Sequence, residues 1–175
     1  MEPLSSFDAM TKVAPAMAST GTPQWLSEDE KQAWTGLISL ILLMPGQLEA
    51  PLRQVDLTLF EYLTLSHISD APDRRIRMSE LAFLANGSLS RLSNVVKRFE
   101  QRGWVIRFPD PDDGRYTLAE LTATGYQMVV KAAPIHVRTV RELVIDPLTS
   151  TDLAALTRIA AKLRVVPPGL AAQHD

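Results

Sequence analysis

The sequence predicts a mainly α-helical fold with one small β-hairpin, an α+β arrangement in one compact unit with terminal extensions. Over most of the chain, apolar residues recur at the three- and four-residue spacing of an amphipathic helix. Ser27, Thr58 and Thr149 each stand three positions before an acid, which is the pattern that caps the start of a helix. Only two short segments, 104–108 and 115–121, show the alternation of a strand.

The first part of the chain predicts an arm followed by a long helix. Residues 1–24 are rich in Ala, Pro, Ser, Thr and Met without a sustained period, and we expect a flexible arm there. A helix should begin after Ser27 and run to about Arg53 within an N-terminal segment of residues 25–56. Pro45-Gly46 should kink or break it, since proline removes a helical hydrogen bond.

The middle of the chain, residues 57–121, predicts three helices and three short extended segments. A second helix starts after Thr58 and ends by Ala71-Pro72, and a small strand follows near 75–78. Ser79 opens a short helix to Ala85, Asn86-Gly87 turns the chain, and a longer helix runs from Ser88 or Leu89 to Arg102. Gly103 ends that helix, and the hairpin "WVIRF" … "RYTLAEL" completes the segment.

The acidic sequence "DPDDGR" at 110–115 joins the two strands and raises the question of a metal site. A helix–loop–helix calcium loop needs oxygen ligands at positions 1, 3 and 5, glycine at 6 and glutamate at 12. Counted from Asp110, those last three positions hold Gly114, Arg115 and Leu121, so the register fails. We therefore expect a tight turn in which Asp-Gly occupies positive-φ positions.

The C-terminal part, residues 122–166, predicts two further helices before a flexible tail at 167–175. Thr122 caps a helix that should be interrupted at Pro134, and Thr149 with Asp152 caps the last helix. That helix carries an apolar stripe that serves either as core of one chain or as a surface shared with a second chain, formed by Leu153, Leu156, Ile159, Ala160 and Leu163.

Composition excludes several classes of function. The 175 residues include no cysteine, which excludes disulfides, thiolate catalysis and zinc–thiolate sites. His67, His136 and His174 are scattered and have no metal-pair spacing. His67, near a helix end, is expected to cap that helix or to be solvated. His136 is expected at the surface, with a ligand contact beside Arg138 and Arg141 as the alternative. We find no catalytic constellation and expect no enzyme, cofactor or metal. The apolar run at 40–44 is too short to cross a membrane, and the N-terminus shows no export signal, so we expect a cytoplasmic protein.

The charge is distributed unevenly along the chain. Residues 74–115 hold nine basic and five acidic side chains, net +4, although the whole chain is at −2. The helix at 88–102 has an apolar stripe of Leu89, Leu92, Val96 and Phe99, opposite a polar face with a single acid, Glu100. That face is either a solvated surface or a contact for an anionic partner, and its hydroxyl, amide and guanidinium groups favour double-stranded DNA.

Each polar residue of this region has an expected role at DNA. The first residues of such a helix approach base edges and the later ones stay near the backbone. Arg115 at the hairpin suits the narrow minor groove, and Asp113 should hold its guanidinium in place. The expected contacts to bases or adjacent phosphates are Ser88, Ser90, Arg91 and Asn94, and those to phosphates are Lys97 and Arg98.

A helix–turn–helix followed by a hairpin is a winged helix, and residues 78–125 resemble the MarR family of winged helix–turn–helix transcriptional regulators. The resemblance rests on Asp113-Gly114-Arg115 followed by Leu121-Thr122 and Gly125, and on "RFEQRGWV". "LTLFEYLTL" and "DPLTSTDLAAL" extend it to about 27–165. Phe83-Leu84 and Asn86-Gly87 depart from the family pattern, but asparagine tolerates the left-handed conformation that the turn needs.

The resemblance implies a homodimer joined through segments 25–56 and 122–166, with two winged domains, 57–121, on a pseudo-palindromic operator. It also implies a small aromatic or anionic effector, for which we consider Trp34, Tyr62, His67 and Phe83 as lining residues. The alternative from another class is a winged helix that docks an acidic protein partner without reading bases.

Overall fold

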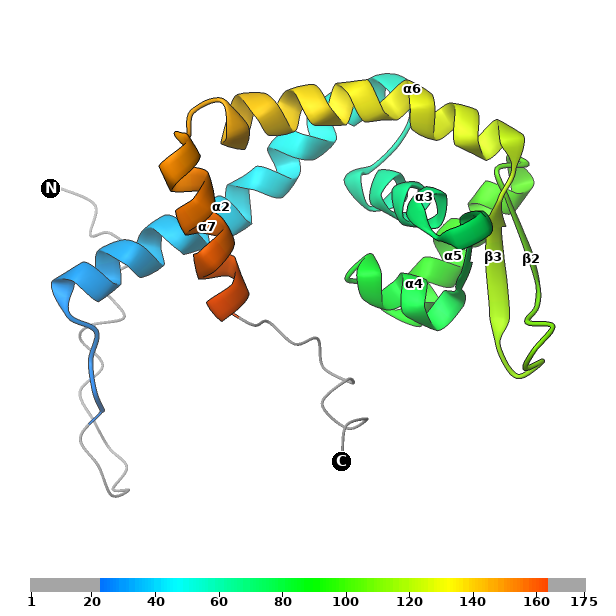
Figure 1. The fold of residues 1–175 in the computed structure, drawn as a ribbon, viewed down its shortest axis with the longest axis horizontal. Helices are drawn as coiled ribbons and strands as arrows, with labels where there is room; N and C mark the ends of the chain where they lie inside the picture. Colours follow the sequence, from blue (N-terminus) through cyan, green and yellow to red (C-terminus); the bar gives the residue numbers. More distant parts are fainter. Residues whose placement is uncertain (1–22, 164–175) are drawn as a thin grey trace, which may run out of the picture. The chain divides into compact units, whose positions relative to one another are not determined.

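The structure is a computed structural model that describes residues 23–163, and its contacts divide the chain into two units, residues 1–38 and 39–175. Figure 1 shows the order of the elements along the chain. The N-terminal arm up to residue 22 and the predicted tail at 167–175 lie outside the described residues. The elements are α2 (Glu28–Leu52), α3 (Leu59–Asp70), β1 (Arg75–Arg77), α4 (Met78–Leu84), α5 (Leu89–Gln101), β2 (Val105–Pro109), β3 (Thr117–Leu121), α6 (Ala123–Val140) and α7 (Ser150–Lys162).

α2 is a continuous helix, so the predicted break at Pro45-Gly46 is wrong. Pro45 deprives the Ile41 carbonyl of its intrahelical donor, but both residues are exposed and water can replace that hydrogen bond. Because the helix continues, Glu28–Val55 is long and apolar enough to cross a membrane by length and composition, with mean hydropathy 1.3 in an 18-residue window. This corrects the expectation that no segment reaches that length.

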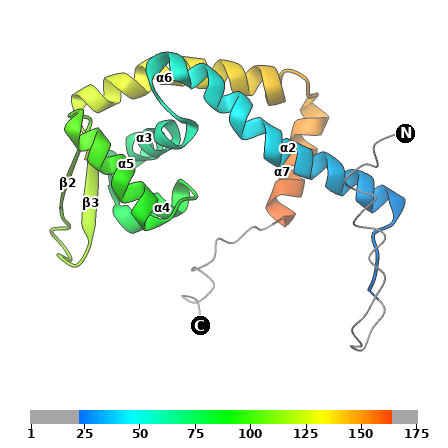
Figure 2. The same ribbon diagram turned by 180° about the vertical axis from the view of Figure 1, so that it is seen from behind.

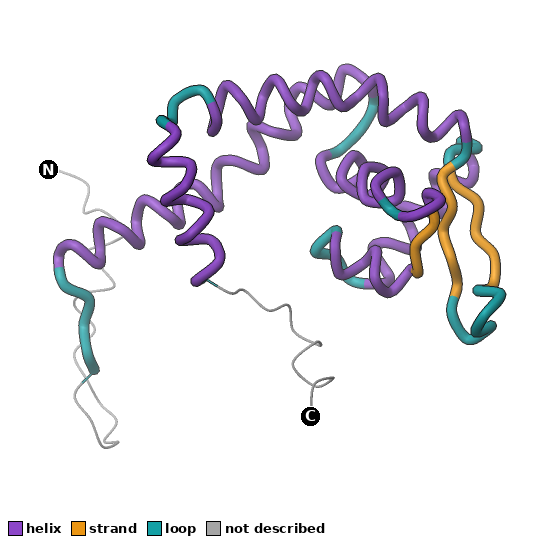
Figure 3. Tube along the Cα trace, viewed as in Figure 1, coloured by secondary structure: helices purple, strands orange, loops and turns teal. Residues whose placement is uncertain are grey.

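α3, α4, α5 and a small antiparallel sheet form the winged part of the second unit. Figure 2 shows α5 lying between α3, α4 and the hairpin of β2 and β3. The strand order is β1-β3-β2, and both outer strands pair antiparallel with β3. Ala119 of β3 lies opposite Ile76 of β1 on one side and opposite Arg107 of β2 on the other. Figure 3 shows the long β2–β3 hairpin with its loop at the tip. The predicted short strand at 75–78 therefore closes a three-stranded sheet.

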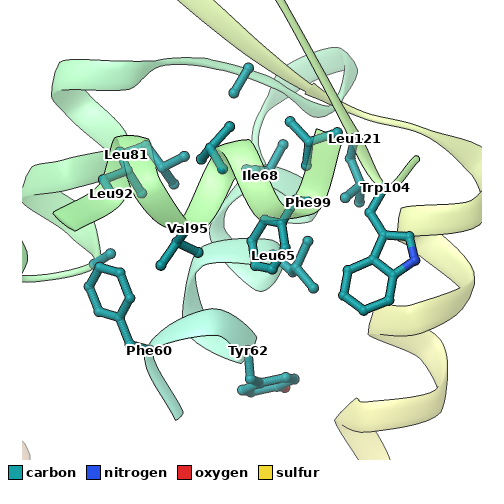
Figure 4. Packing of buried hydrophobic residues seen from close by; sticks show 14 of the residues in the cluster. Phe60, Tyr62, Leu65, Ile68, Leu81, Leu92, Val95, Phe99, Trp104 and Leu121 are labelled. Carbon is teal, nitrogen blue, oxygen red and sulfur yellow. The ribbon is translucent and has the colours of Figure 1, made fainter. Parts of the chain in front are cut away.

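The core lies between α3, α5 and the sheet, and Figure 4 shows its side chains. α5 buries Leu92, Val95, Val96 and Phe99, while Leu89 is 53% exposed. The prediction of Leu89 as part of the buried stripe is wrong because it is the first residue of the helix and lies beyond the packed turns. Phe99 packs against Trp104, with ring centroids 5.7 Å apart, where the strand follows the helix.

Two predicted turns adopt the left-handed backbone that their residues allow. Asn86, between α4 and α5, has φ 51°, and Gly103, after α5, has φ 69°. Gly87 lies against the Phe60 ring, and an added Cβ would come within 2.7 Å of it. α4, in contrast, begins at Met78 after Arg77 and has no side-chain cap, so the expected start at Ser79 is one residue late.

The acidic turn has a different conformation from the one predicted. Neither Asp113 nor Gly114 has positive φ. The turn is held by two carboxylates that accept backbone N–H groups two residues ahead: Asp110 from Asp112 at 3.0 Å and Asp113 from Arg115 at 3.2 Å. These side-chain turns replace the left-handed Asp-Gly pair, because the loop is longer than a two-residue hairpin.

α6 begins at the predicted cap, Thr122, which accepts a hydrogen bond from the Gly125 N–H. It passes through the exposed Pro134 without interruption, which corrects the predicted break, and continues into a π-helical turn at Arg141–Ile145. α7 starts at the predicted capping box of Thr149 and Asp152, and it has no buried residue. Trp104 is buried, whereas Trp25 and Trp34 are exposed.

Candidate nucleic-acid interface

One face of α5 is polar and open to solvent, as the sequence predicted. All its predicted DNA-contacting residues are exposed, and they occupy successive turns of the helix opposite the buried stripe. Such an unobstructed helical surface fits the width of a major groove. The exposed residues of this face are Ser88, Ser90, Arg91, Asn94, Lys97 and Arg98.

The start of α5 is organised by serine hydroxyls. Ser88 is the N-cap, and its Oγ accepts the backbone N–H of Arg91 at 3.2 Å. The Ser88 and Ser90 hydroxyls lie 3.1 Å apart and share a hydrogen bond. The helix therefore starts with two hydroxyl groups beside the free N–H groups of its first turn, an arrangement suited to a phosphate oxygen.

Two arginines of the exposed face also contact α3. The Arg91 guanidinium lies 4.0 Å from the centroid of the Phe60 ring, and Arg98 Nη2 donates to Glu61 Oε1 at 2.7 Å. A groove of about 310 Å³ separates this part of α5 from the end of α2. It is lined by Glu49, Thr58, Phe60, Arg91, Asn94, Val95 and Arg98.

The predicted pair at the hairpin is present. The Arg115 guanidinium donates from Nε to Asp113 Oδ1 at 2.9 Å and from Nη2 to Asp113 Oδ2 at 2.6 Å. Hydrogen bonds from the Arg115 side chain and backbone lower the pKa of Asp113. The Arg115 side chain is 84% exposed, so a groove of DNA can reach it while Asp113 holds its orientation.

Sequence reasoning missed a second ion pair at the hairpin. Arg77 of β1 donates from Nε to Asp110 Oδ2 at 2.7 Å, and its guanidinium lies 4.5 Å from the Tyr116 ring centroid. Asp110 is 5% exposed, and the hydrogen bonds from the Asp112 N–H and from Arg77 lower its pKa. The residues are 33 positions apart, so no local pattern indicated the pair.

Four acids of the hairpin, α5 and β3 are paired with arginines, which limits their repulsion of phosphate. Besides the two pairs at the hairpin, Arg107 donates to Glu100 at 2.5 Å and Arg75 donates to Glu120 at 2.6 Å. Within residues 23–163, no cluster of three or more His, Asp or Glu side chains is arranged to hold a metal ion.

The candidate effector residues lie in different surroundings. Tyr62 is buried in the core, Phe83 is 38% exposed on α4, and Trp34 is exposed within the first unit. His67 lines a cavity of about 210 Å³ near the end of α3, together with Asp70, Ala71, Pro72, Arg75, Ile76, Glu80 and Leu84. Of Tyr62, His67 and Phe83, only His67 lines one of the three cavities described in the second unit.

His136 is not the surface residue that the sequence suggested. Its ring packs on Tyr62 with centroids 4.5 Å apart, and its buried Nδ1 has no hydrogen-bond partner within residues 23–163. Burial lowers its pKa. The tertiary contact between α3 and α6 accounts for the difference, because position 136 lies on the α6 face that covers α3.

Comparison with known proteins places this geometry in a family. The model of the MarR family matches residues 57–117. The crystal structure of Sco3205, a MarR family transcriptional regulator from Streptomyces coelicolor in complex with DNA, matches with a TM-score of 0.72 and 36% identity, covering 81% of this chain and 91% of that chain. AbsC, a MarR family transcriptional regulator from the same organism, matches with a TM-score of 0.74 and 37% identity, covering 81% and 99%.

A curated relative supports the same assignment from sequence. The HTH-type transcriptional repressor IacR of Pseudomonas putida is 27% identical over 119 residues, which is 68% of each chain. With the helix–turn–helix, the three-stranded wing and these similarities together, the chain belongs to the MarR family of DNA-binding transcriptional regulators, which are not enzymes.

Proposed function

We propose that this protein regulates transcription as a homodimer on a pseudo-palindromic operator, with α5 of each subunit in the major groove and each hairpin in the adjacent minor groove. The observation that carries the proposal is the exposed polar face of α5 beside the exposed, Asp113-held Arg115. Ser88, Ser90, Arg91 and Asn94 face the bases and nearby phosphates, and Lys97 with Arg115 supplies cations for the backbone and the minor groove. Because its target is DNA, the protein acts in the cytoplasm.

The dimer is supported by the apolar surface of the second unit. Consecutive residues of α2 are exposed, with Leu42 at 71% and Leu43 at 64%. Ile159 is 48% exposed on α7, which buries none of its residues. Apolar area of this extent is unfavourable in water and indicates a protein partner. A second copy of the chain supplies such a partner with two-fold symmetry, and it matches the two half-sites of a palindrome.

Regulation by a small aromatic or anionic effector completes the proposal. Such an effector acts only if it prefers one spacing of the two α5 helices over another. The proposed lining residues are still Trp34, Tyr62, His67 and Phe83. Of these, His67 lines a cavity that also contains charged side chains.

The proposal is tested with the full chain and DNA recovered from a random-sequence library. We expect one palindromic sequence to be enriched and to bind at least about 10³-fold tighter than random duplex. The logarithm of the binding constant for random duplex should fall linearly with log[salt], and each phosphate contact should contribute about −0.9 to the slope. A protein that docks an acidic partner instead would enrich no sequence, and that result would refute the proposal.

A further inference from the structure

We infer that the first turn of α3 positions the DNA-reading helix, and that Arg98 holds α5 to Glu61 and does not serve as a phosphate contact. This inference rests on the proposed function and refines the role that sequence alone suggested for Arg98. It makes Glu61 and Phe60 positioning residues, which determine operator preference without touching DNA.

The environment of Glu61 is the main support for this inference. Its side chain is 8% exposed, and its carboxylate accepts hydrogen bonds from the Thr58 N–H at 2.9 Å, the Thr58 hydroxyl at 3.0 Å and Arg98 at 2.7 Å. Burial raises the pKa of Glu61, but the hydrogen bonds from Arg98 and Thr58 outweigh it, so the pKa lies below its ordinary value. The carboxylate is thus charged and depends on Arg98 for compensation.

The neighbouring residue, Phe60, contacts α5 at its other end. One side of its ring lies against Gly87 in the turn before α5, where an added Cβ would come within 2.7 Å. The Arg91 guanidinium lies over the ring at 4.0 Å. Phe60 therefore supports the start of α5, as Glu61 supports its later turns.

Two arginines of the polar face therefore have partners within the protein. Arg91 and Arg98 are two turns apart on one side of α5 and both contact α3, but only Arg98 is hydrogen-bonded to it, whereas Arg91 packs on the Phe60 ring and stays exposed. Moving Arg98 to a phosphate would leave the buried Glu61 carboxylate without its cation, which is costly at a buried site. Glu49 of α2 also accepts the Leu59 N–H at 3.2 Å, so the same turn of α3 is anchored to α2.

Salt dependence distinguishes a positioning arginine from a phosphate contact. Binding to the operator and to random duplex of equal length is measured over a salt series for the wild type, Arg98→Gln, Glu61→Gln and the double variant. Arg98→Gln removes the charge but keeps a donor for Glu61, which limits damage to the fold. Lys97→Met, one residue earlier on the exposed face, is the matched control for loss of a phosphate contact.

We expect Arg98→Gln and Glu61→Gln each to reduce the operator-to-random affinity ratio by roughly tenfold, and the double variant to lose no more than either single variant. For random duplex, the slope of log K against log[salt] should keep its wild-type value in Arg98→Gln. In Lys97→Met the magnitude of this slope should fall by about 0.9 per subunit. Circular dichroism melting sets a temperature at which every variant is folded.

The inference is overturned if Arg98→Gln lowers the slope on random duplex as Lys97→Met does, or if the losses of the single variants multiply in the double variant. Should Glu61→Gln fail to fold, the slope of Arg98→Gln alone decides. Failure of the proposed function is a separate result, because the wild type would then show no preference for any sequence.

Discussion

At the scale of single residues, the interface is organised by arginines held at defined partners. Arg115 is held by Asp113 and stays exposed, Arg77 is held by the buried Asp110, and Arg98 is held by Glu61. The same residue type thus performs different tasks, and its partner decides which. In "DPDDGR", Asp110 and Asp113 each accept hydrogen bonds from a backbone N–H group and from an arginine, so these two acids organise the hairpin.

Arg115→Ala should weaken operator binding by about 1–3 kcal/mol, because it removes the exposed guanidinium that is proposed to enter the minor groove. A gel-shift titration measures the change. Arg158→Ala, which removes an exposed arginine from α7, is the control and should bind as the wild type does. Unchanged affinity of Arg115→Ala would remove this residue from the interface.

His136→Phe should flatten the dependence of stability on pH. Burial depresses the pKa of His136 in the folded protein, so the unfolded state takes up the proton first as pH falls below its ordinary value of about 6.5. The contribution of this residue to stability is therefore complete above that pH and is lost as pH falls toward the folded-state pKa. Phenylalanine keeps a ring against Tyr62 and has no proton to bind.

The measurement is the free energy of unfolding in urea at pH 8 and pH 5.5 for both proteins. The wild type should lose more stability between these pH values than His136→Phe does. The other two histidines are common to both proteins and cancel in the comparison. Equal losses would show that His136 is as accessible to protons as it is in the unfolded chain.

At the scale of elements, most helix starts follow the capping residues, whereas proline fails as a stop signal. Thr58, Ser88, Thr122 and Thr149 each accept a backbone N–H of the first turn. α2 and α6 pass through Pro45 and Pro134 because the lost hydrogen bonds face solvent. A capping pair acts locally, but the effect of a proline depends on the surroundings of the carbonyl one turn earlier.

Gly125→Ala should destabilise the protein by about 1–3 kcal/mol or more, because α6 begins against the wing. A Cβ at this position would overlap the Trp104 carbonyl oxygen and come within 2.7 Å of Leu121 Cδ1. Backbone cannot move aside as a flexible side chain can.

Gly36→Ala is the matched control. Position 36 lies in α2 with no atom within 4 Å of an added Cβ, so alanine should stabilise the helix by about 0.5–1 kcal/mol. Thermal unfolding measures both variants, and similar melting temperatures for the two would contradict the close approach of α6 to Trp104.

At the scale of the whole molecule, the described part of the chain has a well-packed winged region and helices with exposed apolar side chains. The winged region buries its core between α3, α5 and the sheet, but α7 buries nothing. Exposed apolar side chains of this extent favour a partner surface, and the proposed second copy would supply it.

Ile159→Glu should dissociate the proposed dimer, because it places a charge in the apolar face of α7. Sedimentation equilibrium without detergent should give a wild-type dimer and a variant whose mass approaches 19.4 kDa at low concentration. Gln101→Glu, an exposed position at the end of α5 and outside the proposed dimer segments, adds the same charge and should stay dimeric. A monomeric wild type, or one soluble only with detergent, would contradict the dimer.

The sequence alone predicted the order and type of the elements, the polar face of α5 and the Asp113–Arg115 pair. These features depend on spacing within a few residues, which capping, amphipathic periodicity and turn chemistry express directly. The tertiary structure alone decided the pairing of β1 with β3, the exposure of Leu89, the partial burial of His136, and the partners of Arg77 and Arg98. The ion pairs of Arg77 and Arg98 join residues that are 33 and 37 positions apart, respectively. The spacing of residues along one helix carries no information about which distant side chain will lie against it.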